Sequence, residues 1–455
     1  MRGVRLLVTA ALIAAMASCK PAGPAGFAGY ADAVTLSPTE NTLRYAVDVN
    51  FTAPCNWRIL YWKKADGRAS GQWTAARHTD GGKERVVLKF LYPETEYEFT
   101  VVPGADFSAE SEVMGFKTGA LPVDCPVYSV EKDGETGLNG YLMQWEASPS
   151  GYVTFCDIDG KVVWYEAFGE EIRVAWCDPA MNRLAVLTGF QDQEVQRLCA
   201  HTVVTDLDGN RILYWTSGKG NIEYPHHEIK ILEDGNLLYV NNVLRDFPIG
   251  TVWGDGFTVI SPDGKKVKEW DCFEGLGDIS APYLKAEKRL TDLVHANSVA
   301  QDSEGNWYMT FNAISELWKI DGKTGDVLYR VGVNGNVTLS GGDFPQGGLH
   351  AATPLSPDRV LCYANGRNIK RSSAVIYKVD ASAKTGVCEL TIPLPEEYSS
   401  TDRSNAQLLE DEGIMLLSST TSRKAVFTDL KGNILRVIGR EGISYRSYWF
   451  NTFEY

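Results

Sequence analysis

This 455-residue chain has few basic residues relative to acidic ones. It contains 44 Lys and Arg and 58 Asp and Glu, which gives a formal net charge of −14. General binding to nucleic acid needs a basic surface that displaces phosphate counterions, so that class of partner is excluded. No stretch after the N-terminus has convincing helical periodicity, which argues against a helical fold. The sequence contains neither a GxxxxGK[ST] phosphate loop nor a Gly-x-Ser-x-Gly element, so neither nucleotide-phosphate binding nor serine-hydrolase chemistry is indicated.

The cysteines lack the spacing of a metal site. None of the nine forms a CxxC pair, which excludes the ligand pattern of zinc knuckles. An exported compartment would permit disulfides, and buried free thiols are an equal alternative for several of these residues. One sequence does not decide the pairing.

The first 19 residues resemble a bacterial lipoprotein signal. Two arginines lie among the first five residues, an apolar run too short to span a bilayer comfortably follows from Leu6 to Met16, and small residues precede Cys19. We expect residues 1–19 to be a signal peptide, Cys19 to carry a lipid anchor, and residues 20–33 to form a flexible tether to the membrane. Ordinary signal cleavage nearby is the alternative. Both interpretations place the mature protein outside the cytoplasm, and the first predicts a periplasmic or outer-membrane-associated lipoprotein of a Gram-negative bacterium.

Residues 34–120 alternate apolar and polar positions, as strands with one buried face do. Leu91–Tyr97 resembles the Leu-x-Pro-x-Thr-x-Tyr corner of fibronectin type III domains, in which the tyrosine locks the entry of a strand into a β-sandwich. We therefore expect a small fibronectin type III-like β-sandwich here. Its predicted role is that of a spacer, and the alternative is that its loops help to line the site of the next domain.

A turn with Asp and Gly between two strands recurs along residues 121–455, and each copy follows another pair of strands. The copies begin at residues 152, 205, 259, 318, 377 and 427, a spacing of roughly 50 to 60 residues. Four strands per repeat, six times, predict a six-bladed β-propeller, because a single sheet cannot bury both faces and neighbouring blades must stack around an axis. The expected fold is all-β, a six-bladed β-propeller preceded by the small β-sandwich.

Histidine is scarce, and its distribution is informative. Four of the six histidines fall at matching places, where an inner strand is expected to begin: His226, His227, His295 and His350. The residue that opens an inner strand of a propeller faces one mouth of the central channel. His227, His295 and His350 are therefore expected to converge there although they are distant in sequence. Asn405 takes the same place in the last repeat.

Converging histidines have several possible uses. Three imidazoles can bind zinc or another transition metal, although only Glu228 and Asp292 offer carboxylates nearby. They can instead hold an anion, or one can act as a nucleophile while the others stabilise charge. They can also be hydrogen-bonded fillers of the channel. Because the histidines form a set in register, a functional role is favoured over a structural one.

These blocks and the C-terminal segment resemble the arylsulfotransferase family. The segments concerned are residues 226–228 with 232–238, residues 295–299, residues 349–351 with 364–366, and residues 443–450. The resemblance covers residues 126–455. It implies transfer of a sulfuryl group from a phenolic sulfate ester to a phenolic acceptor, without a nucleotide sulfate donor and without a cofactor.

The resemblance also implies roles for single residues. His350 matches the nucleophile of the family, which would form a sulfohistidine, and histidine suits this role because its neutral form is abundant near pH 7. His227 and His295 would donate hydrogen bonds to sulfuryl or phenolate oxygens, and Asn297 would add an uncharged donor. His226 is expected to contact the substrate.

One position departs from the family pattern. Asn312 ends the strand after the second block, where the family has an arginine. Arginine offers permanent charge and a planar fork for oxyanions, and asparagine offers neither. We expect Asn312, Asn405 and Arg367 to line the substrate site. The cations that could reach in from other blades are Arg367, Lys370, Arg371, Arg403 and Arg423. Two other functions stay open, a ligand-binding or adaptor propeller without turnover and a metal-dependent propeller enzyme.

Overall fold

The computed structural model describes residues 26–104, 109–190, 198–277, 292–341, 347–452 and 455. The chain divides into two compact units, one that ends at Ala120 and one that begins at Leu121. Strands dominate both, and among the described residues the only α-helix is α2 (Cys272–Leu276). The expected all-β fold is therefore confirmed.

The first unit contains two antiparallel sheets. One consists of β1 (Ala31–Pro38), β2 (Tyr45–Phe51) and β6 (Gly82–Leu88). The other consists of β3 (Cys55–Lys63), β4 (Gln72–Trp73), β5 (Arg77–Thr79), β7 (Glu96–Pro103) and β8 (Met114–Lys117). Two 3₁₀ segments, η1 (Phe27–Gly29) and η2 (Arg68–Ser70), complete this unit.

Two features of the first unit bear on the predictions. Ala31 pairs with Phe51, so β1 begins before Val34 and part of the predicted tether of residues 20–33 belongs to a sheet. At the predicted corner, the hydroxyl of Tyr97 accepts a hydrogen bond from the backbone N–H of Tyr92 at 2.9 Å. This contact agrees with a tyrosine that locks a strand entry. The fibronectin type III assignment itself stays a prediction.

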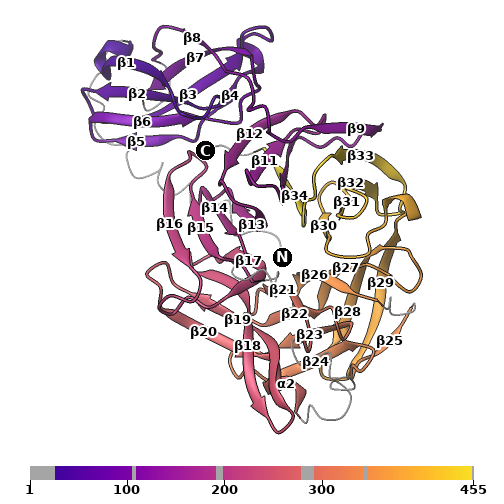
Figure 1. Ribbon diagram of the computed structural model, residues 1–455. Coiled ribbons are helices and arrows are strands. Elements are labelled where there is room, and N and C mark those ends of the chain that lie inside the picture. The colour runs from indigo at the N-terminus through magenta and orange to yellow at the C-terminus, as the bar shows by residue number, and fades with distance from the viewer. Residues whose placement is uncertain (1–25, 105–108, 191–197, 278–291, 342–346, 453–454) are drawn as a thin grey trace. The chain divides into compact units, whose positions relative to one another are not determined.

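The second unit contains six sheets among its described residues, and Figure 1 shows them following one another around a ring in chain order. We call each sheet a blade. The first three are β10 (Gly140–Trp145), β11 (Tyr152–Cys156), β12 (Val162–Ala167) with β34 (Ser447–Asn451); β13 (Ile172–Asp178), β14 (Arg183–Thr188), β15 (His201–Thr205), β16 (Arg211–Thr216); and β17 (Pro225–Ile231), β18 (Leu237–Phe247), β19 (Gly250–Ile260), β20 (Lys266–Asp271).

The other three blades follow the same plan. They are β21 (Ala296–Gln301), β22 (Trp307–Phe311), β23 (Glu316–Ile320), β24 (Val327–Gly332); β25 (Thr338–Ser340), β26 (Leu349–Ser356), β27 (Arg359–Ala364), β28 (Ser373–Asp380), β29 (Thr385–Pro393); and β30 (Asn405–Leu409), β31 (Ile414–Ser419), β32 (Lys424–Asp429), β33 (Ile434–Arg440) with β9 (Tyr128–Asp133). A 3₁₀ turn, η4 (Glu396–Tyr398), lies between the last two. The inner strands β13, β17, β21, β26 and β30 lie toward the middle of the ring (Figure 1).

The repeated Asp-Gly turns join the third and fourth strands of the blades. In the first blade, Oδ1 of Asp157 accepts the backbone N–H groups of Asp159 and Lys161, both at 2.9 Å. Gly160 has φ 75°, a left-handed conformation that favours glycine. Asp429 makes the same two bonds in the last blade, at 2.9 and 2.8 Å. The side chain thus replaces backbone partners inside the turn, which is why Asp recurs there.

Apolar side chains fill the spaces between neighbouring blades. In β27, Val360 and Cys362 pack toward the preceding blade, where Tyr308 lies. Leu361 of the same strand packs toward the following blade, against residues that include Met415. Successive side chains of a strand point to opposite faces. Both faces of β27 are therefore buried, which accounts for its continuous apolar sequence.

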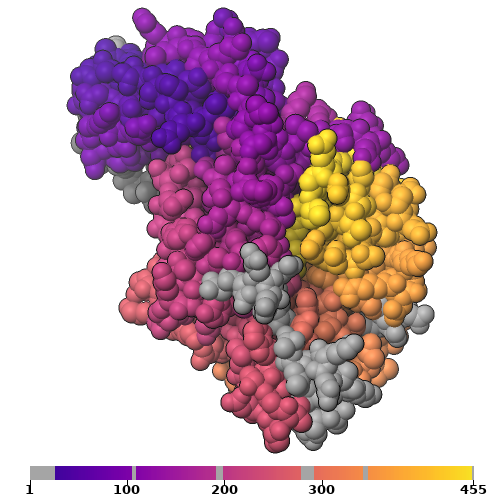
Figure 2. Space-filling model, viewed as in Figure 1, coloured from indigo at the N-terminus to yellow at the C-terminus, as the bar shows by residue number. Residues whose placement is uncertain are grey.

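The ends of the second unit close the ring. The C-terminal strand β34 pairs with β10 from Gly140↔Asn451 to Gln144↔Ser447. In the last blade, β9 pairs with β33 from Arg436↔Asp133 to Arg440↔Tyr128. Figure 2 shows the yellow C-terminal residues directly against the purple residues of the first blade. The first and last blades therefore each combine strands from both ends of the unit.

Residues 1–25 lie outside the described residues, so the signal peptide and the lipidation of Cys19 stay predictions. Over the described ranges, no helix has the length and apolar character needed to cross a membrane. Eight cysteines lie in those ranges, and all except Cys388 are buried.

Candidate functional site

The histidines lie where inner strands begin. His227 belongs to β17, His350 belongs to β26, and His295 directly precedes β21. The backbone φ angles are 60° at His227, 53° at His295 and 54° at Ala351, which follows His350. The pairing register shifts near each of these residues. Bulges of this kind re-aim side chains and are frequent next to active sites.

The three histidines do not share one register position, which differs from the expectation. The second strand of each of these blades offers a common reference position, the residue directly before an asparagine. The pairs at this position are Pro225↔Asn241, Ala296↔Phe311 and Leu349↔Ala364. Relative to these pairs, His227 lies two residues later, His295 one earlier and His350 one later. The bulges compensate for part of this offset, since the ring centroids of His227 and His295 are only 5.0 Å apart.

His350 occupies an enclosed site among positive charges. Only 3% of the residue is exposed. Burial lowers the pKa of His350 well below 6.5, and the charges of Arg446, His295 and Arg367 lower it further. His350 is therefore a neutral imidazole at pH 7, the form in which a ring nitrogen has a lone pair for attack on an electrophile.

His227 forms a hydrogen bond with the neighbouring His226. Their Nδ1 atoms are 2.7 Å apart and their rings are nearly perpendicular, at 89°. Nε2 of His226 lies 3.3 Å from Oδ1 of Asp255, and the side chains of both are buried. The expectation that His226 contacts the substrate is therefore not supported, because the fully buried ring is placed between His227 and Asp255.

His295 has a carboxylate partner of its own. Its Nδ1 lies 2.8 Å from Oδ2 of Asp292, and its side chain is 30% exposed. On the other side of the cluster, the ring of Tyr445 lies 5.9 Å from that of His227. The cluster therefore contains two histidines that are connected to carboxylates and a third, His350, that lies among cations.

Arg446, to which sequence reasoning assigned no role, is a buried cation of this site. Its Nη1 donates to both carboxylate oxygens of Glu228 at 2.7 Å, and its Nη2 donates to the backbone oxygen of Asn297 at 2.6 Å. Glu228, weighed above as a metal ligand, thus neutralises an arginine that is distant in sequence. The signal was present, since Arg446 lies in the C-terminal segment that carries the resemblance and Glu228 directly follows His227.

Arg367 brings a second cation to Asn312. Its Nη2 donates to Oδ1 of Asn312 at 3.0 Å, and its Nε donates to the backbone oxygen of Thr401 at 2.6 Å. The amide nitrogen of Asn312 lies 3.5 Å from Nδ1 of His350. Gly348 leaves room for this arrangement, because a Cβ there would lie 2.8 Å from Nδ2 of Asn312 and 3.3 Å from Cζ of Arg367. Asn312 thus connects a cation from the next blade to His350.

Two asparagines predicted to act on the substrate serve the scaffold instead. The amide of Asn297 donates to the backbone oxygen of Leu349 at 2.8 Å and accepts from the hydroxyl of Thr310 at 2.6 Å, which ties β21 to β26 beside His350. The amide of Asn405 donates to the backbone oxygen of Ser447 at 2.8 Å and accepts from its N–H at 3.0 Å. Asn405 therefore holds the inner strands β30 and β34 together, and its amide oxygen and nitrogen are both engaged.

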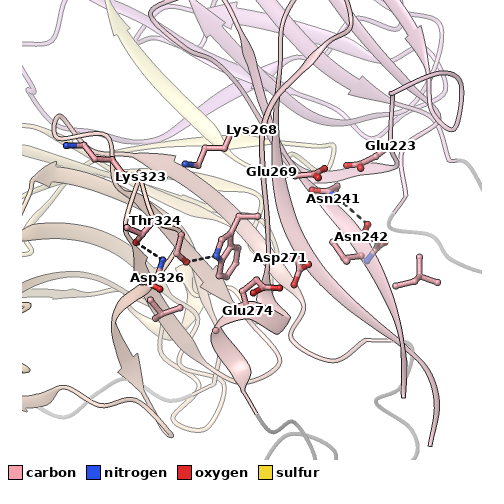
Figure 3. A pocket seen from close by; sticks show the side chains of 16 residues that line it. Glu223, Asn241, Asn242, Lys268, Glu269, Asp271, Glu274, Lys323, Thr324 and Asp326 are labelled. Atoms are coloured by element: carbon pink, nitrogen blue, oxygen red, sulfur yellow. Dashed lines mark hydrogen bonds between the residues drawn. The ribbon is translucent and has the colours of Figure 1, made fainter. Parts of the chain in front are cut away.

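No group of three His, Cys, Asp or Glu side chains in the described ranges is arranged to hold a metal ion. A polar cavity of about 940 Å³ lies beside the blade of β17–β20 (Figure 3). Its lining includes Glu223, Asn242, Lys268, Asp271 and Lys323, and no described histidine is part of it. We assign the candidate site to the histidine cluster, because imidazoles can act as nucleophiles and as acids or bases.

Comparison with known proteins gives one family. A family model described as Arylsulfotransferase (ASST) matches residues 126–440. No curated protein matches the sequence. Among solved structures, a protein of unknown function from Bacteroides caccae is 12% identical with a TM-score of 0.45, over 69% of this chain and 100% of its own. The periplasmic gluconolactonase PpgL of Pseudomonas aeruginosa is 10% identical with a TM-score of 0.40, over 68% and 98% of the two chains.

Proposed function

The chain belongs to the arylsulfotransferase family, and we propose that it transfers a sulfuryl group from a phenolic sulfate ester to a phenolic acceptor through a sulfohistidine at His350. The observation that carries this proposal is the contrast within the histidine cluster. His350 is neutral and lies among cations, whereas His227 and His295 are each linked to a carboxylate. A nucleophile for an anionic ester needs the first environment, and groups that exchange protons with phenolic oxygens need the second.

In the first half-reaction a ring nitrogen of His350 attacks the sulfur of the donor. The nitrogen–sulfur bond forms as the bond between sulfur and the aryl oxygen breaks, and the electron pair leaves with the phenolate. Charge on the sulfuryl oxygens would be met by Arg367, which reaches Asn312. One preorganised donor of this kind is typically worth about 10²–10³ in rate.

In the second half-reaction the oxygen of the acceptor phenol attacks the sulfur of the sulfohistidine. The oxygen–sulfur bond forms, the nitrogen–sulfur bond breaks, and its electron pair returns to the ring of His350. The acceptor must lose its phenolic proton to a base as it attacks. His227 and His295, whose ring centroids lie 5.0 Å apart in an edge-to-face arrangement, are the two candidates for this proton transfer.

The decisive experiment uses para-nitrophenyl sulfate as donor and phenol as acceptor. We expect the protein to release para-nitrophenol and form phenyl sulfate, and His350→Ala to lower both by several orders of magnitude, because the covalent route is lost. The matched control is His201→Ala, which removes a histidine that is paired with Glu170 at 2.8 Å and lies outside the cluster. Activity that is unchanged in His350→Ala would refute the nucleophile.

A second candidate function is ligand binding without turnover, and Asn312 in place of the family's arginine favours it. If no phenol is released from any of a broad panel of aryl sulfates, but these esters raise the melting temperature of the wild-type protein and not that of Arg367→Ala, binding is the better description. Transfer activity that persists after exhaustive chelation would argue against the metal-dependent alternative.

We also propose that the protein works outside the cytoplasm, anchored by a lipid on Cys19. Support for this comes from the N-terminal sequence alone, with its basic start, its short apolar run and its small residues before the cysteine. The anchor would hold the site near a membrane surface, where apolar phenols gather.

A further inference from the structure

The buried groups behind His226 determine which of its nitrogens carries the proton. Asp255 accepts the backbone N–H of Ala296 on Oδ2 at 2.7 Å and an amide N–H of Asn242 on Oδ1 at 2.8 Å. An ionised carboxylate only accepts hydrogen bonds. Nε2 of His226 lies 3.3 Å from Oδ1 of Asp255. A lone pair on Nε2 would be repelled by the ionised carboxylate at this distance, so Nε2 is the nitrogen that carries the proton. A neutral His226 then carries its lone pair on Nδ1.

That lone pair determines the tautomer of His227. The Nδ1 atoms of His226 and His227 are 2.7 Å apart, so one of them donates to the other. Because Nδ1 of His226 accepts, Nδ1 of His227 carries the proton and Nε2 of His227 has the lone pair. A neutral His227 in this tautomer is a proton acceptor at Nε2, which differs from the hydrogen-bond donor that the family resemblance implies.

We propose that Asp255 and His226 are positioning residues that hold His227 in the tautomer whose Nε2 takes the proton of the phenolic acceptor. The inference rests on the proposed function. As the acceptor oxygen bonds to sulfur, its O–H bond breaks and the proton goes to Nε2 of His227. The bond between sulfur and His350 breaks at the same time, so His350 recovers its lone pair and His227 becomes an imidazolium.

The surroundings of His227 explain why this charge needs Asp255. The groups near it include the rings of His295 and Tyr445, at 5.0 and 5.9 Å, and Arg446, whose Nη2 lies 3.4 Å from the backbone oxygen of His227. Glu228 is adjacent in sequence, but both of its oxygens accept from Arg446. Asp292 lies 2.8 Å from Nδ1 of His295. The carboxylate coupled to Nδ1 of His227 is Asp255, which acts through the ring of His226.

The first test reads the tautomer directly in the full-length wild-type protein. Nitrogen-15 NMR of protein labelled in its six histidines distinguishes a ring with the proton on Nδ1 from one with the proton on Nε2. The His227 signals are assigned by their loss in His227→Gln. We expect the proton on Nδ1 above the pKa of the ring. A neutral His227 with its proton on Nε2 would overturn the inference, and this outcome requires no Asp255 variant to fold.

The second test is Asp255→Asn. The backbone N–H of Ala296 keeps the amide oxygen on its side, so the new NH₂ group faces Nε2 of His226. Asn242 can turn its amide, because its Oδ1 is buried without a hydrogen-bond partner in the described structure, and this turn gives up the 3.3 Å bond from its Nδ2 to the backbone oxygen of Gly254. His226 must then protonate Nδ1, and His227 must shift its proton to Nε2. We expect this shift in the spectrum.

The kinetic consequence separates a positioning role from a structural one. With para-nitrophenyl sulfate as donor, we expect Asp255→Asn to form the sulfohistidine at close to the wild-type rate, because para-nitrophenolate leaves without a proton. Transfer to phenol should slow about 10²-fold or more, the usual contribution of a general base. A variant that slows both steps equally, or that keeps the wild-type His227 tautomer, would overturn the inference.

The matched control is Glu170→Gln. It neutralises the carboxylate that lies 2.8 Å from Nδ1 of His201, outside the cluster. We expect this variant to leave the His227 tautomer and both half-reactions unchanged. If the wild-type protein turned over no aryl sulfate at all, the proposed function would fail while the NMR result would still decide the tautomer.

Discussion

At the scale of single residues, neighbouring imidazoles in one cluster have different electrostatic environments. His350 is buried with cations around it, His295 is partly exposed beside Asp292, and His227 is connected to Asp255 through His226. A cation next to a histidine opposes its protonation, and a carboxylate favours it. The roles of the three histidines therefore cannot be assigned from residue type alone. They follow from the charges around each ring.

The low pKa of His350 predicts a contribution to stability that depends on pH. An unfolded His350 binds a proton near pH 6.5, whereas the folded one stays neutral well below that value. Stability rises with pH wherever the unfolded chain binds more protons. Between pH 6.5 and the lower folded-state pKa, His350 should therefore reduce the free energy of unfolding by up to about 1.4 kcal/mol for each unit that the pH falls.

This prediction is measured by urea unfolding of the wild type and His350→Asn at pH values from neutral to mildly acidic. The other histidines are common to both proteins and cancel in the comparison. We expect the wild type to lose stability more steeply below pH 6.5 than the variant. Parallel curves would mean that His350 is protonated as easily in the folded protein as in the unfolded chain.

At the scale of elements, the site depends on the bulges with which the inner strands begin. Ala351, directly after His350, has a φ angle of 54°, whereas the φ angle of Ala352 is not positive. Both alanines are buried, at 5% and 1% exposure. The left-handed conformation costs a residue with a Cβ roughly 1–2 kcal/mol. The bulge that aims His350 is thus maintained against a local backbone cost.

The pair of alanines gives a matched test of this cost. We expect Ala351→Gly to leave the free energy of unfolding nearly unchanged, because the relief of backbone strain offsets the entropy of a freer unfolded chain and the lost buried methyl group. Ala352→Gly should lower it by about 1.5 kcal/mol, since there the entropy cost and the lost methyl group act without any relief of strain. Chemical unfolding measures both. Equal destabilisation by the two substitutions would contradict a strained bulge.

The sequence predicted the elements of the propeller better than the details of its site. Each blade encodes its own turn, as Asp157 and Asp429 show, so local residues were enough to find the strands. The bulges insert residues that leave no pattern, so the offset between the histidines could not be seen. The pair of Arg446 and Glu228 joins residues 218 positions apart, and only the closed ring brings them together.

The sequence allowed a cation near Asn312 to be expected, but it did not identify which basic residue this would be. Arg367 was one of five basic residues that could approach Asn312 from other blades. Two glycines make room for it. A Cβ at Gly347 would lie 2.9 Å from the backbone nitrogen of Arg367, and a Cβ at Gly348 would lie 2.8 Å from Nδ2 of Asn312. Asn405 shows the opposite case, since a residue at the expected place in a repeat uses its amide to hold β34.

At the scale of the whole molecule, closure of the ring supports the site. β34 supplies the inner strand of the first blade, and Arg446, the residue directly before it, binds Glu228 of the third blade. Trp449 of β34 is only 2% exposed and packs against Phe427 of the last blade, with ring centroids 5.7 Å apart. The C-terminal segment therefore links three blades, and its loss would disturb both the fold and the charge next to His350.

We expect truncation after Arg446, which removes β34, to abolish cooperative thermal unfolding of the second unit, because β10 loses its inner partner and Asn405 loses both hydrogen bonds to Ser447. The milder substitution Trp449→Ala should keep the fold and lower the free energy of unfolding by about 3–5 kcal/mol, the usual range for a buried tryptophan.

The control for the truncation is a chain that starts at Leu121, the first residue of the second unit. Calorimetry should show that this chain retains the transition of the propeller, because every strand of its six sheets follows residue 121. If the chain without β34 melted as cooperatively as the full-length protein, the closure of the ring would not be the source of its stability, and the position of Arg446 would have to depend on Glu228 and Asn297 alone.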